Sequence, residues 1–142
     1  MESPIQFVLD GSVTMAWFFK DELNAYADAV RDALVGAQAV VPTLWPLEVA
    51  NTIAVGERRK RSTPAQAATW LSILGTLPIV VDSETATRAW GETLSLARAQ
   101  KLSAYDAAYL ELAMRLGLPI ATLDDQLRVA AKAVGVNLFD IV

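Results

Sequence analysis

The feature that most constrains the fold is an alternation of short apolar runs with longer segments of helical periodicity. The short runs are rich in Val, Ile, Leu or Phe, which is typical of buried strands. Because parallel strands need a crossover connection, this alternation predicts an α/β fold in three layers, a short and mostly parallel sheet with helices on both faces. The predicted strands cover Gln6–Leu9, Ala39–Val41, Ile79–Val81, Ile120–Thr122 and Asn137–Ile141.

Helices are predicted between these strands, and several of them carry start or stop signals. Thr63 and Pro64 are typical of a helix start, as is Ser83, whereas Gly117 and Gly135 favour left-handed helix ends. The predicted helices cover Val13–Phe19, Ala25–Leu34, Leu47–Arg59, Ala65–Leu74, Glu84–Gln100, Ala104–Leu116 and Gln126–Val134. With 142 residues and no long linker, a single domain over residues 1–142 is expected.

Composition excludes several kinds of chemistry. The sequence contains no cysteine and no histidine, which rules out disulfides, zinc sites built on thiolate or imidazole, and Ser-His-Asp catalysis. The net charge of −4 argues against broad electrostatic binding of nucleic acid. A cytoplasmic location is expected, since the sequence has neither a long uncharged apolar stretch nor a signal-peptide pattern at its start.

Four acidic residues fall where an α/β sheet places its active sites, at strand ends or in the first turn of a nearby helix. Asp10 ends the first predicted strand, and Asp124 follows the fourth. Glu48 and Asp106 lie in the first turns of predicted helices. We therefore expect these four carboxylates to converge.

Converging carboxylates point to a hard divalent cation. Mg²⁺ and Mn²⁺ prefer oxygen ligands and need no histidine, whereas acids without a cation would repel one another. Such an ion can polarise a phosphoryl oxygen or activate a water, which favours phosphodiester hydrolysis. The polar neighbours Ser12, Asn51 and Thr122 have spacings that could orient ligands and waters.

Each acid also has a structural interpretation. Asp106 could form a capping box with Ser103, and Glu48 could stabilise a helix N-terminus whatever its function. Asp10 before a glycine could form an Asx turn, and Asp124 could cap the last helix. The four positions together are more specific than any one of them.

The segments around these acids resemble successive motifs of PIN domains, in order and spacing, over essentially the whole chain. The matching segments are LDGSV, LEVAN, SAYDAAYLELA and ATLDDQL. The resemblance implies an acidic site of Asp10, Glu48, Asp106 and Asp124, with Asp125 as a neighbour that could share a role.

In the compact bacterial members, the VapC-type toxins, the resemblance implies an endoribonuclease that depends on magnesium or manganese. It also implies inhibition by a small antitoxin of the VapB type and assembly as a homodimer, or a larger complex with the antitoxin.

Two other features bear on RNA. A basic run could guide the RNA backbone or could simply complement the negative end of a helix; it comprises Arg58, Arg59, Lys60 and Arg61. Several aromatic residues could stack on bases, although helical spacing more often indicates a core or an interface; they are Trp17, Phe18, Phe19, Trp70 and Trp90.

Three other functions remain possible at this point. An aspartate-based phosphatase would need a second acid where Ser12 stands, and a receiver-like phosphoacceptor would need a lysine near the last strand, where the sequence is VNLFDIV. A catalytically silent PIN-like module that binds RNA or protein would be favoured by the loss of an acid, and none of the four is lost.

Overall fold

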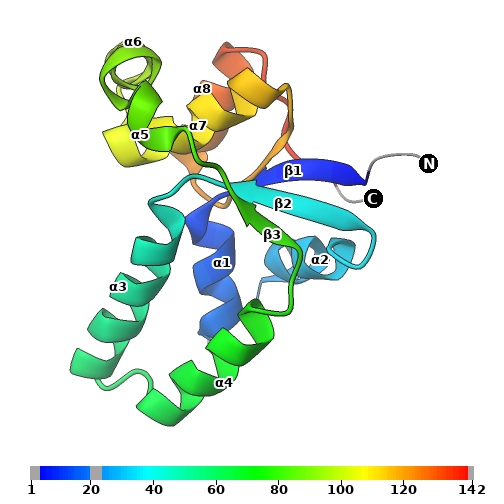
Figure 1. Cartoon of the computed structure of the whole chain (residues 1–142), viewed down its shortest axis with the longest axis vertical. Coiled ribbons are helices and arrows are strands. Elements are labelled where there is room, and N and C mark those ends of the chain that lie inside the picture. The colour runs from blue at the N-terminus through cyan, green and yellow to red at the C-terminus, as the bar shows by residue number, and fades with distance from the viewer. Residues whose placement is uncertain (1–3, 20–23, 141–142) are drawn as a thin grey trace.

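The computed structural model describes residues 4–19 and 24–140, and its centre is a four-stranded parallel sheet with the order β3-β2-β1-β4 (Figure 1). The strands are β1 (Ile5–Leu9), β2 (Ala37–Val41), β3 (Ile79–Val81) and β4 (Ile120–Ala121). Phe7 of β1 pairs with Ala39 of β2, and Val8 pairs with Ile120 of β4. Most residues of β1, β2 and β4 are buried, as expected where helices cover both faces of a parallel sheet, whereas Val80 and Val81 of the edge strand β3 are exposed.

Helices lie on both sides of the sheet, which confirms the predicted α/β class in three layers (Figure 1). On one side lie α1 (Gly11–Phe18), α2 (Ala25–Ala33), α3 (Trp45–Arg58) and α4 (Pro64–Leu74). The other side carries α5 (Thr85–Arg88), the π-helical turn η1 (Ala89–Thr93), α6 (Leu94–Gln100), α7 (Ala104–Leu116) and α8 (Asp125–Ala133). The core between the layers includes the fully buried Phe7, Tyr109 and Leu110.

Two expectations about the elements need correction. The predicted fifth strand, 137–141, is a single bridge between Leu138 and Ile120 in its described part, because β4 offers only two residues to pair with; residue 141 lies outside the described ranges. The helix predicted over Glu84–Gln100 is interrupted by the wider turn η1, which contains Gly91, a weak helix former.

Most of the predicted helix ends are confirmed. Thr63 and Gln66 form a capping box around Pro64, and Gly117 and Gly135 have φ values of 66° and 80°. The prediction for Ser83 was wrong, since the residue at the start of α5 is Glu84, whose backbone N–H donates to Asp82. No helix in the described part of the chain is long and apolar enough to cross a membrane.

The strand order places a topological switch beside β1. The chain proceeds outward from β1 to β2 and β3, and then returns to form β4 on the opposite edge of β1. Connections therefore leave β1 and β4 toward opposite faces, which opens a crevice at their carboxyl ends. Asp10 and Asp124 follow these two strands, so the fold itself brings the first and last predicted site residues to one place.

Candidate active site

Asp10 is the most buried of the predicted site acids, with 5% of its surface exposed. It follows β1 as the N-cap residue of α1, yet its side chain makes no capping hydrogen bond. Instead, its Oδ2 accepts hydrogen bonds from the Ser12 hydroxyl at 2.6 Å and the Thr122 hydroxyl at 2.8 Å. The Asp10 carboxylate is therefore held in place by one hydroxyl from the start of α1 and one from the segment after β4.

The segment that follows β4 is tied to the same carboxylate. Thr122 is 1% exposed, and its hydroxyl oxygen also accepts from the backbone N–H of Asp124 at 3.0 Å. The Ser12 hydroxyl accepts from the backbone N–H of Leu123 at 3.0 Å. Asp124 itself caps α8, since its Oδ1 accepts from the backbone N–H of Leu127 at 2.8 Å. The structural interpretation of Asp124 is thus correct, and it is compatible with a second role for the remaining oxygen.

Glu48 reaches the same place from α3, where Pro46 lies in the first turn. Its Oε1 accepts a hydrogen bond of 2.5 Å from the hydroxyl of Tyr109 in α7. A Cβ atom built on Gly11 would lie 3.5 Å from that Oε1 and 3.5 Å from the Tyr109 hydroxyl. Glu48 and Tyr109 therefore meet at the start of α1, one residue after Asp10.

Asp106 completes the set from the first turn of α7. Its backbone N–H donates to the Ser103 hydroxyl at 3.1 Å, which confirms Ser103 as the cap of this helix. Its carboxylate, in contrast, makes no hydrogen bond or ion pair with the described residues. Asp106 is thus the acid whose side chain is least constrained.

The electrostatics show that the four acids are neighbours. The pKa of Asp106 is raised to about 6, mainly by burial and in smaller part by the charges of Asp10 and Asp124. Burial is also the main cause of the raised pKa of Glu48, with contributions from the charges of Asp10 and Asp106. The pKa of Asp10 is raised by burial and by Asp124, against the lowering effect of its hydrogen bonds to Ser12 and Thr122. These four residues are called the unpaired acids below, because none has an ion-pair partner among the described residues.

The donor atoms fit a hard divalent cation, since they are all oxygens and no side-chain cation in the described ranges neutralises them. However, no three acidic side chains among the residues described here are arranged so that they could hold a metal ion as they stand. The ligand types therefore fit Mg²⁺ or Mn²⁺, while the side chains would have to move closer together around an ion.

Other predicted site residues are not drawn into this network. Asn51 is exposed, its side chain makes no hydrogen bond with the described residues, and it lies on α3 one turn beyond Glu48. Asp125 is exposed in the first turn of α8. A role for either in catalysis or metal binding stays a prediction.

The basic run of Arg58 to Arg61 is also far from the acids. It is exposed and begins at the last residue of α3, ten residues after Glu48. At a rise of about 1.5 Å per residue, that is about 15 Å along the helix. The guanidinium of Arg61 lies over the ring of Phe19, 4.0 Å from its centroid. This position at the distal end of α3, visible in Figure 1, does not favour contact with RNA at the acids.

Sequence reasoning missed Tyr109, which is 1% exposed and whose hydroxyl donates a hydrogen bond to Glu48. One signal was present: a tyrosine within an otherwise apolar helical segment needs a hydrogen-bond partner when it is buried. Its position three residues after Asp106 also places the two side chains on neighbouring parts of one helix face.

A second group of acids was also missed, and it is neutralised. Arg115, 12% exposed by side chain, contacts Asp82 at 2.8 Å, Glu111 at 2.9 Å and Glu84 at 3.3 Å. Hydrogen bonding to Arg115 lowers the pKa of Asp82. These four residues are called the Arg115 network below.

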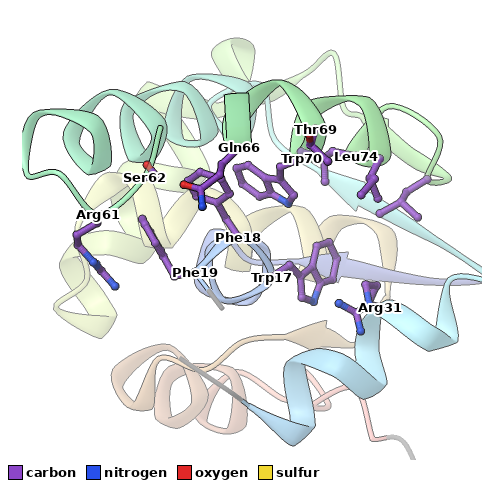
Figure 2. A pocket seen from close by; sticks show the side chains of 12 residues that line it. Trp17, Phe18, Phe19, Arg31, Arg61, Ser62, Gln66, Thr69, Trp70 and Leu74 are labelled. Carbon is purple, nitrogen blue, oxygen red and sulfur yellow. The ribbon is translucent and has the colours of Figure 1, made fainter. Parts of the chain in front are cut away.

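A large cavity lies away from all of these acids, between α1, α2 and α4 (Figure 2). It has a volume of about 650 Å³, and its walls include Trp17, Phe18 and Trp70, with Arg31 and Arg61 at its edge. Phe18 and Trp70 stack with ring centroids 4.5 Å apart, and Trp17 donates to the carbonyl of Ala27. The predicted core interpretation is therefore confirmed for these three aromatic residues, whereas Trp90 on η1 is 93% exposed.

Comparison with known proteins identifies one family. The family model described as PIN domain matches residues 7–133. No characterised protein matches this chain at the level of sequence. Three solved structures share its fold at low identity: PAE2754 from Pyrobaculum aerophilum, VapBC2 from Rickettsia felis bound to a DNA fragment from its promoter, and FitAcB from Neisseria gonorrhoeae.

The overlap with these structures extends over almost the full length of each chain. PAE2754 is 19% identical with a TM-score of 0.63, over 96% of this chain and 90% of that one. The VapBC2 chain is 14% identical with a TM-score of 0.66, over 95% and 98%. The FitAcB chain is 20% identical with a TM-score of 0.52, over 94% and 96%. At these identities the likeness establishes the fold.

Proposed function

The chain belongs to the PIN-domain family, and from that premise we propose that it is an endoribonuclease that depends on Mg²⁺ or Mn²⁺, the toxin of a VapC-type toxin-antitoxin pair. The observation that carries the proposal is the set of four unpaired acids at the carboxyl ends of β1 and β4. The chain keeps these acids together without a cation of its own among the described residues, although burial and, to a lesser extent, mutual repulsion raise the pKa values of Asp10, Glu48 and Asp106. A bound divalent cation would relieve that repulsion.

Each of these side chains has a distinct role in the proposed site. Asp10 is held by Ser12 and Thr122 and provides a fixed ligand, while Tyr109 holds Glu48 at the opposite side. Asp106, whose carboxylate makes no hydrogen bond with the described residues, turns toward these two and closes the site. The chemistry that the ion supplies when bound is the polarisation of a phosphoryl oxygen and the activation of a water.

Cleavage of single-stranded RNA tests this function. We expect the purified protein to cut RNA with Mn²⁺, to stop when a chelator is added, and to lose activity in the Asp10→Asn variant. RNA that stays intact with Mn²⁺ while the protein still binds it would instead support a silent PIN-like module. Transfer of phosphate onto Asp10 would support an aspartate-based phosphatase.

We further propose that a small antitoxin binds the cavity of Figure 2 with an apolar segment. The cavity is lined by aromatic and aliphatic side chains, which bind an amphipathic helix well. The likeness of fold to VapBC2 and FitAcB supports a partner of this kind.

A pair of charge insertions on α4 tests the docking site. Ile73 lines the cavity and is 53% exposed, whereas Leu71 is 46% exposed and lies outside the cavity wall. With the proposed antitoxin as the probe, Ile73→Glu should weaken the complex by about tenfold or more. Leu71→Glu should leave it unchanged. Equal effects of the two variants would reject the cavity as the binding site.

We also propose a homodimer, supported by apolar side chains that remain exposed. Trp90 is 93% exposed on η1, and Val80 and Val81 are exposed on β3, the edge strand of the sheet. Exposed apolar side chains of this size are typical of interfaces. Sedimentation of the wild type and of Trp90→Ser measures the effect, and we expect the variant to shift toward the monomer.

A further inference from the structure

We infer that Arg128 and Lys132 form an RNA-binding pocket next to the acids, which holds the phosphate backbone of the single strand that the proposed nuclease cuts. The pocket has a volume of about 510 Å³ and lies where α8 meets the C-terminal segment 135–140 and the start of α2. Arg128, Lys132 and Tyr26 line it. The inference rests on the proposed function, since it assigns the substrate path to that active site.

The link to the active site passes through one residue. The Nε of Arg128 donates to the backbone carbonyl of Thr122 at 2.9 Å, and the hydroxyl of the same Thr122 donates to Asp10 at 2.8 Å. Arg128 also lies one helical turn after Asp124 on α8. A phosphate bound by Arg128 would therefore lie beside Thr122, the residue that orients Asp10, although none of the four acids lines the pocket itself.

Arg128 is held in place, and the group that would bind phosphate is left available. Its guanidinium lies 5.3 Å from the ring centroid of Tyr26, whose hydroxyl donates to the carbonyl of Phe139 at 2.7 Å. Of the three guanidinium nitrogens, only Nε donates a hydrogen bond to the described residues, and the guanidinium makes no ion pair with them. The two terminal nitrogens thus remain for a phosphate oxygen, the geometry in which arginine binds phosphate best.

Lys132 extends the basic surface by one further turn along the same face of α8. It is exposed and forms no ion pair within the described ranges. Asp140 is the one carboxylate among the described residues that line the pocket, and it is exposed. The lining therefore keeps an excess of positive charge on a protein whose net charge is −4, which is the local arrangement that a phosphate backbone requires.

Binding of a short labelled single-stranded RNA, measured by fluorescence anisotropy over a range of salt concentrations, tests the pocket. All variants carry Asp10→Asn and are kept with chelator, so that the RNA is not cut. We expect Arg128→Gln/Lys132→Gln to weaken binding about tenfold and to reduce the slope of log K against log salt by about 1.4, or about 0.7 per lost phosphate contact.

The matched control is Arg58→Gln/Arg59→Gln, which also removes two positive charges, but at the distal end of α3. We expect it to change binding less than about twofold. A loss of affinity equal to that of the α8 variant, or no loss in the α8 variant, would overturn the inference. Lys132→Gln alone guards against misfolding, because the Lys132 side chain makes no hydrogen bond or ion pair with the described residues, and this variant should still weaken binding.

The outcome is separable from that of the proposed function. Wild-type cleavage that requires Mn²⁺ and Asp10 can hold while the α8 variants bind RNA normally, and then only the pocket is rejected. If the wild type does not cut RNA at all, the nuclease proposal fails, and the binding measurement still decides whether Arg128 and Lys132 contact RNA.

Discussion

The unpaired acids and the Arg115 network use the same kind of side chain to opposite effect. In the network, Asp82, Glu84 and Glu111 surround one guanidinium, and hydrogen bonding to Arg115 lowers the pKa of Asp82. Among the unpaired acids, burial and mutual repulsion raise the pKa values of Asp10, Glu48 and Asp106. Helix α7 contributes to both groups, with Asp106 in its first turn and Arg115 in its last.

The free-energy cost of burying a carboxylate therefore does not by itself explain why the unpaired acids lack a cationic partner. A buried charge is ordinarily paired, and this chain supplies an arginine where its acids serve the fold. At the carboxyl ends of β1 and β4 it supplies hydroxyl donors instead, which orient carboxylates without neutralising them. We interpret the first group as structural and the second as a site for an external cation.

Breaking each group in turn should give opposite results, and this is the largest expected effect. Arg115→Met leaves the buried Glu111 and the partly buried Asp82 without their cation and should lower the free energy of unfolding by about 3 kcal/mol. Asp10→Asn should cut RNA cleavage at least about 100-fold with little loss of stability, because an amide oxygen can still accept from Ser12 and Thr122.

Urea unfolding and a cleavage assay measure both quantities in both variants. The control is Arg98→Met, which removes an exposed arginine from α6. If Asp10→Asn were as destabilising as Arg115→Met, the distinction between a structural and a functional group of acids would be lost.

Manganese should stabilise the protein through the unpaired acids alone. At about 100 times its Kd, an ion that binds only the folded state adds about 2.7 kcal/mol, which thermal melting detects as a rise of several degrees. The rise should shrink in Asp106→Asn and persist in Asp82→Asn, although the latter variant starts from a lower Tm. A melting curve that does not respond to millimolar Mn²⁺ would argue against a cation site.

Removal of the Tyr109 hydroxyl should have a smaller effect. Tyr109→Phe keeps the buried ring and removes the hydrogen bond to Glu48, so Mn²⁺ affinity should fall about tenfold while the fold persists. Calorimetric titration with Mn²⁺ measures the change. Tyr105→Phe is the matched control on the same helix, since Tyr105 is 68% exposed. Equal affinities for wild type and Tyr109→Phe would show that Glu48 needs no positioning by this residue.

The smallest expected effect is an opposite pH dependence of stability in the two groups. The folded-state pKa of Asp106 is raised from 3.8 to about 6. Its contribution to the free energy of unfolding is therefore fully present below pH 3.8 and is lost as the pH rises through about 6. The folded-state pKa of Asp82 is lowered, so its contribution to the free energy of unfolding is present above pH 3.8 and is lost as the pH falls through the lowered pKa.

Urea unfolding in the presence of chelator, at pH values across this window, measures both trends. Asp106→Asn should remove part of the decline toward neutral pH, and Asp82→Asn should remove part of the decline toward acid. If Asp106→Asn left the profile of the wild type unchanged, a raised pKa at this position would be contradicted.

Much of the fold could be predicted because its signals are local. The apolar runs and helix caps specified the four strands and most helix boundaries, and Thr63, Gly117 and Gly135 act as predicted. The prediction of a fifth strand was wrong because a strand also needs a partner strand of sufficient length, and β4 has only two residues. Partner length is a property of the assembled sheet.

The sequence by itself determined which acids stand at strand ends and helix starts, because a parallel sheet places such residues at one edge whatever the rest of the chain does. Only the tertiary structure decided which carboxylates are neutralised. Asp82 also follows a strand, yet it meets Arg115 from the end of α7, whereas Asp10 meets the hydroxyl of Thr122 from beyond β4. Contacts between residues this far apart depend on how the helices pack over the sheet, and no local pattern encodes them.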